Sequence, residues 1–129
     1  MPITAVEDGT ACSAADRFTK LYYDAQDRKR NKMNFLYVQD AQLVWNGQLI
    51  QGAEEIAKFW ESLPNSSHTL SSIDCHALED ITNDSKPLVV LCVGTVILGA
   101  MVHAFTQTFI LSMDDDKYKI LSDRFRFID

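Results

Sequence analysis

Asp123 is the side chain in this sequence with the best position for acid–base chemistry. It alternates with Leu121 and Phe125 in the run Tyr118–Ile128, and alternate residues of a β-strand point to the same face of the sheet. We therefore expect all three side chains to point into the core. A carboxyl group that is removed from water has a raised pKa and can act as a general acid.

A structural role for Asp123 is the competing interpretation. Buried carboxylates are almost always hydrogen-bonded, and a helix tyrosine or a tryptophan indole could donate to this one. In the pair Tyr22-Tyr23 we expect Tyr22 to face the core and Tyr23 to lie nearer the rim. No second catalytic group converges on Asp123 in the pattern. We favour the structural role, and no catalytic residue is predicted.

The histidines and cysteines do not have the spacing of metal ligands. His68, His76 and His103 lie on or near different predicted strands, and Cys75 and Cys92 do not complete a ligand set with them. The third cysteine is Cys12. The three cysteines form neither a Cys-x-x-Cys motif nor an even set for disulfides. The sequence therefore predicts no metal, no cofactor and an intracellular, reducing compartment.

Basic residues gather at one place only, Arg28-Lys29-Arg30 with Lys32. We interpret this cluster as a solvated face, with contact to RNA or to an acidic partner as the alternative. The net charge of −6 argues against a general affinity for nucleic acid or anionic membranes. No apolar run reaches the roughly 18 residues of a membrane span, and residues 1–8 do not resemble a signal peptide.

Helical patterns come first along the chain, and strands follow, which is typical of an α+β domain over 1–129. After an expected mobile arm at residues 1–9, Ser13 is expected to cap a first helix. Shorter helices are predicted at Arg30–Leu36 and over Ile56–Leu63, before Pro64. Asn46-Gly47 predicts a hairpin. The predicted strands are Gln42–Trp45, Leu49-Ile50, Leu70–Ala77, Leu88–Leu98, Met101–Leu111 and Tyr118–Ile128, with a turn at residues 83–87 before the fourth of them.

Leu88–Leu98 is apolar on both faces of the strand that it forms. An antiparallel strand with one face in water normally alternates apolar and polar residues. Bulky aromatic residues such as Phe105, Phe109 and Phe125 suit the face that packs on the helices. No helix remains for the other face, so we expect a partner protein to cover it. The expected partner-binding residues are Leu91, Val93, Thr95, Thr106, Thr108, Arg124 and Arg126.

Several motifs together resemble one family. They are Leu21-Tyr22-Tyr23, Leu43-Val44-Trp45-Asn46-Gly47, Leu63-Pro64-Asn65-Ser66-Ser67, Phe105-Thr106-Gln107-Thr108-Phe109 and Ser122-Asp123-Arg124-Phe125-Arg126-Phe127. In order and spacing they resemble the nuclear-transport-factor-2-related export proteins of the nuclear transport factor 2-like superfamily. The resemblance implies a cone in which three N-terminal helices pack on a strongly curved, mostly antiparallel sheet.

The same resemblance implies a function. Export proteins of this family are non-enzymatic cofactors that pair, sheet against sheet, with the transport-factor-like domain of a nuclear RNA export factor. The heterodimer carries mRNA, and by extension some proteins, through nuclear pores. The expected localisation is therefore the nucleus, the cytoplasm and the nuclear pore, with Ran GTPase and nucleoporins as further partners that the resemblance raises.

Two alternatives remain open within this superfamily. One is a homodimeric import factor that binds the GDP form of Ran. The sequence Val44-Trp45-Asn46-Gly47 and the end of the chain just after Phe125-Arg126-Phe127 favour the export branch. The other is a small isomerase or hydrolase with a pocket inside the cone. In isomerase-like relatives the general base occupies the position that matches Trp45, and an indole cannot abstract a proton.

Overall fold

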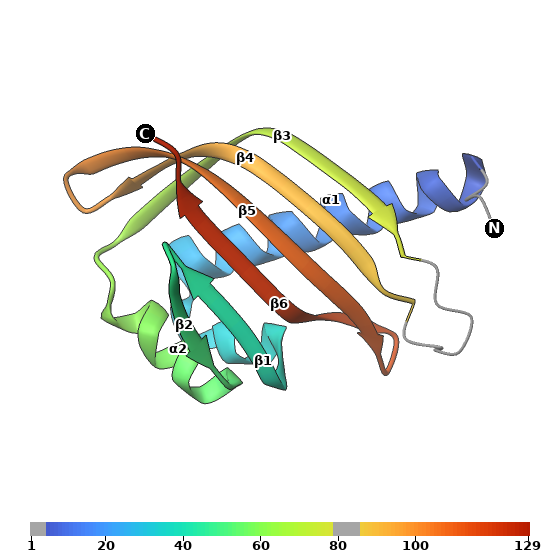
Figure 1. Ribbon diagram of the computed structural model, residues 1–129, viewed down its shortest axis with the longest axis horizontal. Helices are drawn as coiled ribbons and strands as arrows, with labels where there is room; N and C mark the ends of the chain where they lie inside the picture. The colour runs from blue at the N-terminus through green and yellow to red at the C-terminus, as the bar shows by residue number, and fades with distance from the viewer. Residues whose placement is uncertain (1–4, 79–85) are drawn as a thin grey trace.

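The chain forms a single curved sheet with helices on one side (Figure 1). The computed structural model describes residues 5–78 and 86–129, with side chains from residue 12. The helices are α1 (Ala5–Arg28), the 3-10 helix η1 (Arg30–Leu36) and α2 (Ala53–Ser62). The strands are β1 (Tyr37–Trp45), β2 (Gln48–Gln51), β3 (Ser66–Ala77), β4 (Leu88–Leu98), β5 (Met101–Asp114) and β6 (Lys117–Phe127). The predicted α+β class is confirmed.

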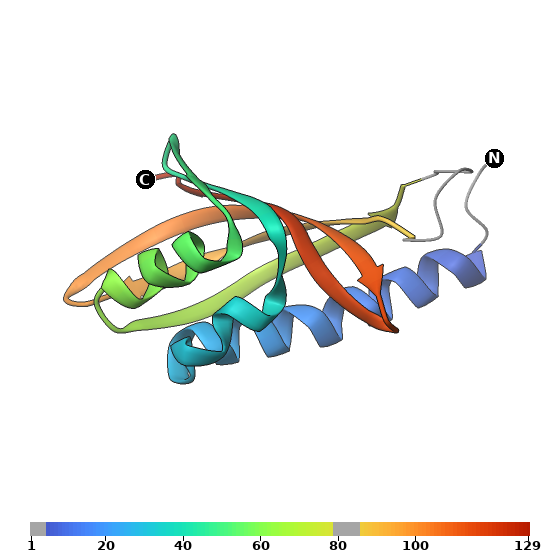
Figure 2. The ribbon, with the colours of Figure 1, turned by 90° about the horizontal axis from the view of Figure 1, so that it is seen from below.

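The sheet has six strands in the order β2-β1-β6-β5-β4-β3. Neighbouring strands run antiparallel except β1 and β6, which pair in parallel. The helix α1 lies across one face, which we call the inner face, and the sheet arches over it (Figure 2). The helices α2 and η1 pack on each other and on β1, so all helices lie away from the opposite, outer face of β4, β5 and β6.

Curvature of the sheet comes in part from bulges. In β3, Leu70 pairs with Gly94 and Ser72 with Val93, which leaves Ser71 as an extra residue. A β-bulge bends its strand and increases the local twist. Gly94 is required at this point, because a Cβ atom there would lie 2.2 Å from the carbonyl oxygen of Thr69.

Helix α1 begins at Ala5, so the predicted start at Ser13 was wrong. Ser13 instead lies within the helix, where its Oγ accepts a hydrogen bond from Arg17 at 3.5 Å. Residues 5–12 contain no proline, and their single glycine, Gly9, lowers helix stability by only about 1 kcal/mol. Of the arm expected at residues 1–9, residues 1–4 lie outside the described chain and residues 5–9 belong to α1.

A second bulge changes the inner face of β6. Ile110 pairs with Ser122 and Leu111 with Ile120, so Leu121 is the extra residue. Ile120 is therefore buried, whereas Leu121 is 39% exposed. The prediction that Leu121 shares the inner face with Asp123 and Phe125 was wrong, and Ile120 takes its place. Both Asp123 and Phe125 point inward as predicted.

Several predicted elements have the expected bounds, and two strands begin earlier than predicted. Asn46 and Gly47 have φ angles of 46° and 89°, which is the conformation of the type I′ hairpin turn that this dipeptide favours. η1 and β4 have the predicted bounds. β1 and β3 begin earlier than predicted, at Tyr37 and Ser66. The predicted turn at residues 83–87 lies mainly outside the described residues.

Candidate partner-binding surface

The outer face of β4 is apolar and open to solvent. Leu91, Val93 and Ile97 are 41%, 36% and 49% exposed, while Val90, Cys92 and Val96 on the inner face are buried. The predicted division of this strand into a core face and an uncovered face is therefore confirmed. Exposed large apolar residues that gather on one surface are typical of interaction sites.

The register places six of the seven predicted binding residues in two rows across the sheet. Leu91 on β4 pairs with Thr108 on β5, which pairs with Arg124 on β6. The next row joins Val93, Thr106 and Arg126 in the same way. Thr95, the seventh, continues along β4 and pairs with Ala104. The structure thus brings all of these residues together on one continuous surface.

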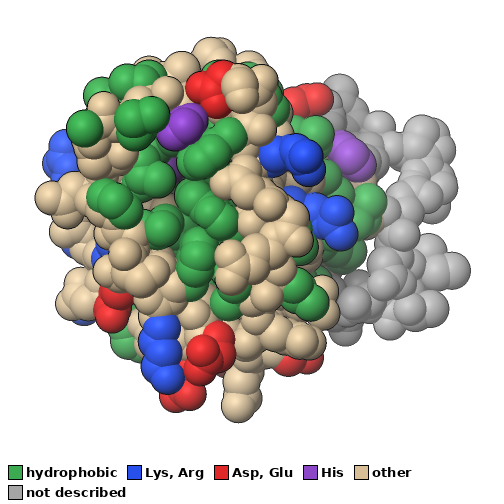
Figure 3. Space-filling model, turned by 60° about the vertical axis from the view of Figure 1, so that its left-hand side comes forward, with side chains coloured by type: hydrophobic (Ala, Val, Ile, Leu, Met, Phe, Trp, Pro, Cys, Tyr) green, Lys and Arg blue, Asp and Glu red, His purple; other side chains and the backbone are tan. Residues whose placement is uncertain are grey.

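Further apolar residues extend this surface beyond the predicted set. Ile97 pairs with Val102 near the β4–β5 turn, and Val102 and Ile128 are 62% and 54% exposed. Leu121 adds to the other end of β6 because of its bulge. In Figure 3, hydrophobic side chains gather on the sheet face in view, with basic side chains beside them. The sequence already showed Ile97 and Val102 on this face by alternation, but only the register shows that they are adjacent.

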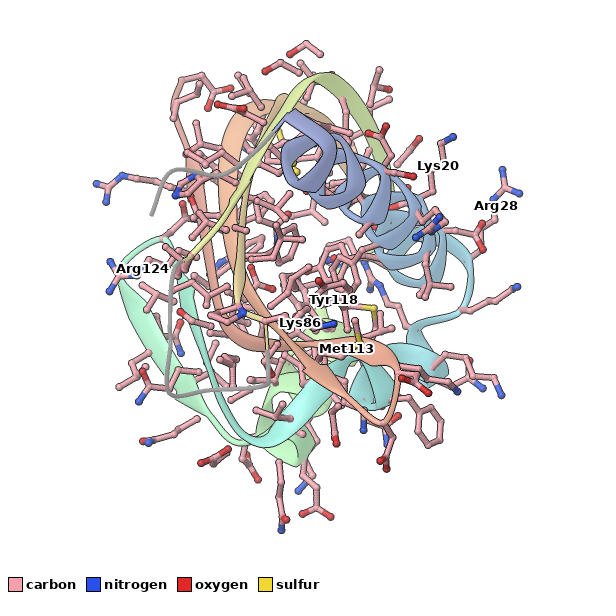
Figure 4. The ribbon with its side chains drawn as sticks, turned by 90° about the vertical axis from the view of Figure 1, so that its right-hand side faces the viewer. Lys20, Arg28, Lys86, Met113, Tyr118 and Arg124 are labelled. Atoms are coloured by element: carbon pink, nitrogen blue, oxygen red, sulfur yellow. The ribbon has the colours of Figure 1, made fainter. Side chains whose placement is uncertain are left out.

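Charges lie at the two margins of this surface. Arg124 and Arg126 are exposed on β6, and Arg124 points away from α1 (Figure 4). Among the described residues, neither guanidinium has an ion pair. At the other margin, Asp74 on β3 lies opposite Leu91 and is exposed. An uncovered apolar centre between polar margins is the usual anatomy of a protein–protein interface.

On the inner side of the sheet, Asp123 is completely buried and accepts three hydrogen bonds. The Tyr37 and Tyr22 hydroxyl groups donate to Oδ2 at 2.7 and 3.1 Å, and Gln107 Nε2 donates to Oδ1 at 2.8 Å. The indole of Trp60 in turn donates to the Tyr37 hydroxyl at 3.0 Å. The expectation that a helix tyrosine donates to Asp123 is confirmed, whereas the indole reaches it only through Tyr37.

Burial raises the pKa of Asp123 to about 6, although the hydrogen bonds from Gln107, Tyr37 and Tyr22 favour the ionised form. The pKa values of both tyrosines are raised as well, first by burial and then by the nearby carboxylate. Asp123 lines neither of two surface hollows of about 270 and 480 Å³. Its oxygens already accept hydrogen bonds from protein donors, as a buried carboxylate requires.

Two further aromatic residues, Tyr23 and Trp45, pack on the inner side of the sheet. Tyr23 was expected near the rim, but it is 7% exposed and its hydroxyl donates to Gln107 Oε1 at 2.6 Å. The buried side chain of Gln107 accounts for the inward position of Tyr23, and nothing in the sequence indicated this contact. Trp45 stacks on Phe125 with ring centroids 4.5 Å apart and packs edge-on against Trp60. The Trp45 indole therefore fills space inside the cone.

Two of the three histidines, His68 and His103, have partners within the chain. His68 is paired through Nδ1 with Asp27 Oδ1 at 2.6 Å. Burial alone would raise the pKa of Asp27, but hydrogen bonds from His68 and Ser66 lower it. His103 stacks on Phe127, with ring centroids 3.9 Å apart. Within the described residues, no group of three His, Cys, Asp or Glu side chains could hold a metal ion.

The basic cluster is not one continuous patch. Arg28 and Lys29 lie near Asp24 at 3.7 and 3.6 Å. Arg30 turns inward, where its guanidinium donates to the backbone carbonyl groups of Leu63 and Pro64 at 2.5 and 2.6 Å. Arg30 therefore ties η1 to the segment after α2. In the described chain, no helix has the length and apolar character needed to span a membrane.

Comparison with known proteins identifies the family. The model of the nuclear transport factor 2 (NTF2) domain matches residues 14–127. A Caenorhabditis elegans protein named NTF2-related export protein is 41% identical, over 95% of this chain and 92% of its own. NTF2-related export protein 1 of Bos taurus is 38% identical, over 94% and 91%. Nuclear transport factor 2 of Schizosaccharomyces pombe is 28% identical, over 87% and 91%.

Solved structures share the fold at lower identity. Nuclear transport factor 2 of Cryptosporidium parvum has a TM-score of 0.81 at 21% identity, over 93% of this chain and 96% of that one. The structure of the Candida albicans Mtr2-Mex67 M domain complex contains a chain with a TM-score of 0.75 at 17% identity, over 92% and 96%. A protein described as a putative scytalone dehydratase of Novosphingobium aromaticivorans has a TM-score of 0.76 at 16% identity, over 93% and 85%, and so shares this architecture. From the family match and the relatives above 30% identity, the chain belongs to the NTF2 domain family and, within it, to the NTF2-related export proteins.

Proposed function

We propose that this chain is a nuclear export cofactor that forms a heterodimer with an mRNA export receptor and supports the passage of mRNA through nuclear pores. The names of its relatives at 34–41% identity support this role. The same names support shuttling between nucleus and cytoplasm, and the nuclear pore as a site of action is part of the proposal. The proposal also includes Ran and nucleoporins as further partners.

The uncovered outer face is the observation that carries the proposal. Leu91, Val93, Ile97 and Val102 form an apolar strip across β4 and β5. We propose that the transport-factor-like domain of the export receptor packs on this strip, sheet against sheet. Five of the seven residues named from the sequence would lie toward the centre of that interface, and the other two, Arg124 and Arg126, would form its basic margin. Stable complexes of this kind commonly bury roughly 2,000 Å² or more in total.

A non-enzymatic role is part of the same proposal. The carboxyl group with the best position for catalysis, Asp123, is enclosed by Tyr22, Tyr37 and Gln107. Trp45, which the family resemblance sets at the position of the general base in isomerase-like relatives, fills space beside Phe125. Because structural neighbours include dehydratases, the fold itself decides nothing about activity. The non-enzymatic part of the proposal therefore rests on the filled interior of this chain.

Affinity purification of the tagged chain from cell extract tests the function most broadly. Recovery of a nuclear RNA export factor in a one-to-one ratio is the expected result, measured by quantitative mass spectrometry and by the mass of the complex in solution. Recovery of Ran with a homodimer of the tagged chain, and without an export factor, would instead assign it to nuclear import. Nuclear accumulation of polyadenylated RNA on depletion of the chain is the expected cellular effect.

A further inference from the structure

Two cysteines far apart in the sequence meet where α1 crosses the edge strand β3. The Cys75 thiol donates to Cys12 Sγ, with the two sulfur atoms 3.1 Å apart. Cys12 is exposed on α1, and Cys75 is 7% exposed on the inner face of β3. The odd number of cysteines and their spacing gave no sign of this contact, because it depends on how the helix packs on the sheet.

We propose that Cys12 and Cys75 form a reversible disulfide when the chain meets a peroxide oxidant. A disulfide has a sulfur–sulfur distance of about 2.05 Å, so the two atoms need to approach by only about 1 Å. Rotation of the two side chains is sufficient for this movement, since α1 and β3 are already packed together. Disulfides in reducing compartments are usually transient and redox-sensing.

The chemistry proceeds in two balanced steps. The exposed Cys12 thiolate attacks one peroxide oxygen, so that a sulfur–oxygen bond forms, the oxygen–oxygen bond breaks and hydroxide leaves. The Cys75 thiolate then attacks the sulfenic sulfur of Cys12, which forms the disulfide and releases the second hydroxide. The two thiols lose two electrons and two protons in total, and hydrogen peroxide becomes two molecules of water. A dithiol reductant reverses the reaction.

The third cysteine provides an internal control. Cys92 lies on the inner face of β4 and is 1% exposed, and burial raises the pKa of its thiol to about 11. The thiolate is the reactive form of cysteine, so Cys92 remains an unreactive thiol at neutral pH. It is expected to stay reduced under conditions that join the other two.

The disulfide would leave the outer face unchanged. Cys75 points inward, and its neighbour Asp74 is the residue of β3 that lies beside Leu91 on the outer face. Oxidation would therefore fasten α1 to the edge of the sheet without altering the proposed docking surface. Closing a loop from residue 12 to residue 75 restricts the unfolded chain and is expected to raise the melting temperature by roughly 10 °C.

The test treats the reduced full chain with hydrogen peroxide and then alkylates the remaining thiols. Expected are a monomer that lacks the mass of two hydrogen atoms, a linked peptide pair containing Cys12 and Cys75, a raised melting temperature, and reversal of all three by dithiothreitol. Cys92→Ser should behave as the wild type. Cys12→Ser, a change at an exposed position, should lose the linkage and the rise in melting temperature.

Three results would overturn the proposal. One is a peroxide-treated chain in which all three cysteines are still alkylated. Another is a linkage that joins two chains through Cys12 instead of two residues of one chain. The third is a rise in melting temperature that is the same in Cys12→Ser as in the wild type. None of these results depends on the identity of the binding partner, so the proposed export function is tested separately.

Discussion

At the scale of single residues, Asp123 shows how a buried carboxyl group is held by its surroundings. Its two oxygens accept hydrogen bonds from Tyr22, Tyr37 and Gln107, which come from α1, β1 and β5. Asp123 itself lies on β6. A buried carboxylate is costly unless its hydrogen bonds are made, and here four elements meet to make them. The cluster therefore fixes the position of α1 relative to the sheet.

Ionisation of Asp123 should make stability depend on pH. Its folded pKa of about 6 is above the ordinary value of 3.8. The stabilising contribution is therefore fully present below pH 3.8 and is lost as the pH rises through 6. We expect Asp123 to add about 1.5 kcal/mol to the free energy of unfolding at pH 5 relative to pH 8. Asp123→Asn, which is nearly isosteric, should lack this component.

Urea unfolding of both proteins at pH 5 and pH 8 measures this difference directly. In Asp123→Asn the amide oxygen can still accept the hydrogen bond from Gln107, and the Tyr22 and Tyr37 hydroxyl groups can rotate to accept from the new amide nitrogen, so the variant should fold. Other titrating groups, Asp27 among them, contribute equally to both proteins and cancel. An identical pH dependence in the two proteins would show that Asp123 does not titrate near pH 6.

Arg126 carries a second prediction at this scale. It is exposed at the margin of the apolar strip, in one row with Val93 and Thr106. We expect a carboxylate of the partner to pair with its guanidinium, since an arginine needs a counter-charge once water is excluded. Arg126→Glu should weaken binding at least about tenfold, as measured by isothermal titration calorimetry.

Arg28→Glu is the matched control for Arg126→Glu. Arg28 is exposed on α1, and Figure 4 shows it on the side of the molecule opposite Arg124, the neighbour of Arg126 on the outer face. Arg28→Glu should bind the partner normally. In a rescue experiment, replacing the partner's paired acidic residue with lysine should partly restore the binding of Arg126→Glu. Equal binding by Arg126→Ala and the wild type would place Arg126 at a wet rim.

At the scale of elements, several features that depend on neighbouring residues were predicted correctly. Features that depend on contacts between residues far apart in the sequence were missed. The bounds of β4 and the Asn46-Gly47 turn follow from alternation and turn chemistry, which are properties of neighbouring residues. The bulge at Leu121 was missed because it depends on the register between β6 and β5. The inward position of Tyr23 was missed because its partner, Gln107, is 84 residues away. The meeting of Cys12 and Cys75 was missed for the same reason.

The bulge in β6 can be tested with two adjacent substitutions. Ile120 is completely buried, whereas Leu121 is 39% exposed on the outer side. Ile120→Ala should lower the free energy of unfolding by about 3 kcal/mol, because it leaves a cavity in the core. Leu121→Ala should lower it by less than about 1 kcal/mol. If chemical denaturation showed a larger loss in the free energy of unfolding for Leu121→Ala than for Ile120→Ala, the bulge would be contradicted and a regular register supported.

At the scale of the whole molecule, the two sides of the sheet have different occupants. Aromatic rings, α1 and the hydrogen-bond cluster around Asp123 fill the inner side. The outer side of β4–β6 retains an apolar strip with Asp74 at one margin and Arg124 and Arg126 at the other. This asymmetry agrees with the proposed function, since the inner side of the sheet is filled by the chain's own residues and the outer side is available for a partner.

The most direct test of this account introduces a charge into the centre of the strip. Binding of Val93→Glu to the transport-factor-like domain of a nuclear RNA export factor is measured by isothermal titration calorimetry, with Leu21→Glu as the control. Leu21 is 57% exposed on α1, away from the outer face. We predict that Val93→Glu loses binding, because its carboxylate would be buried without a partner, while its circular dichroism spectrum stays normal. Unchanged binding by Val93→Glu, or an equal loss with Leu21→Glu, would contradict the assignment of the outer face as the docking surface.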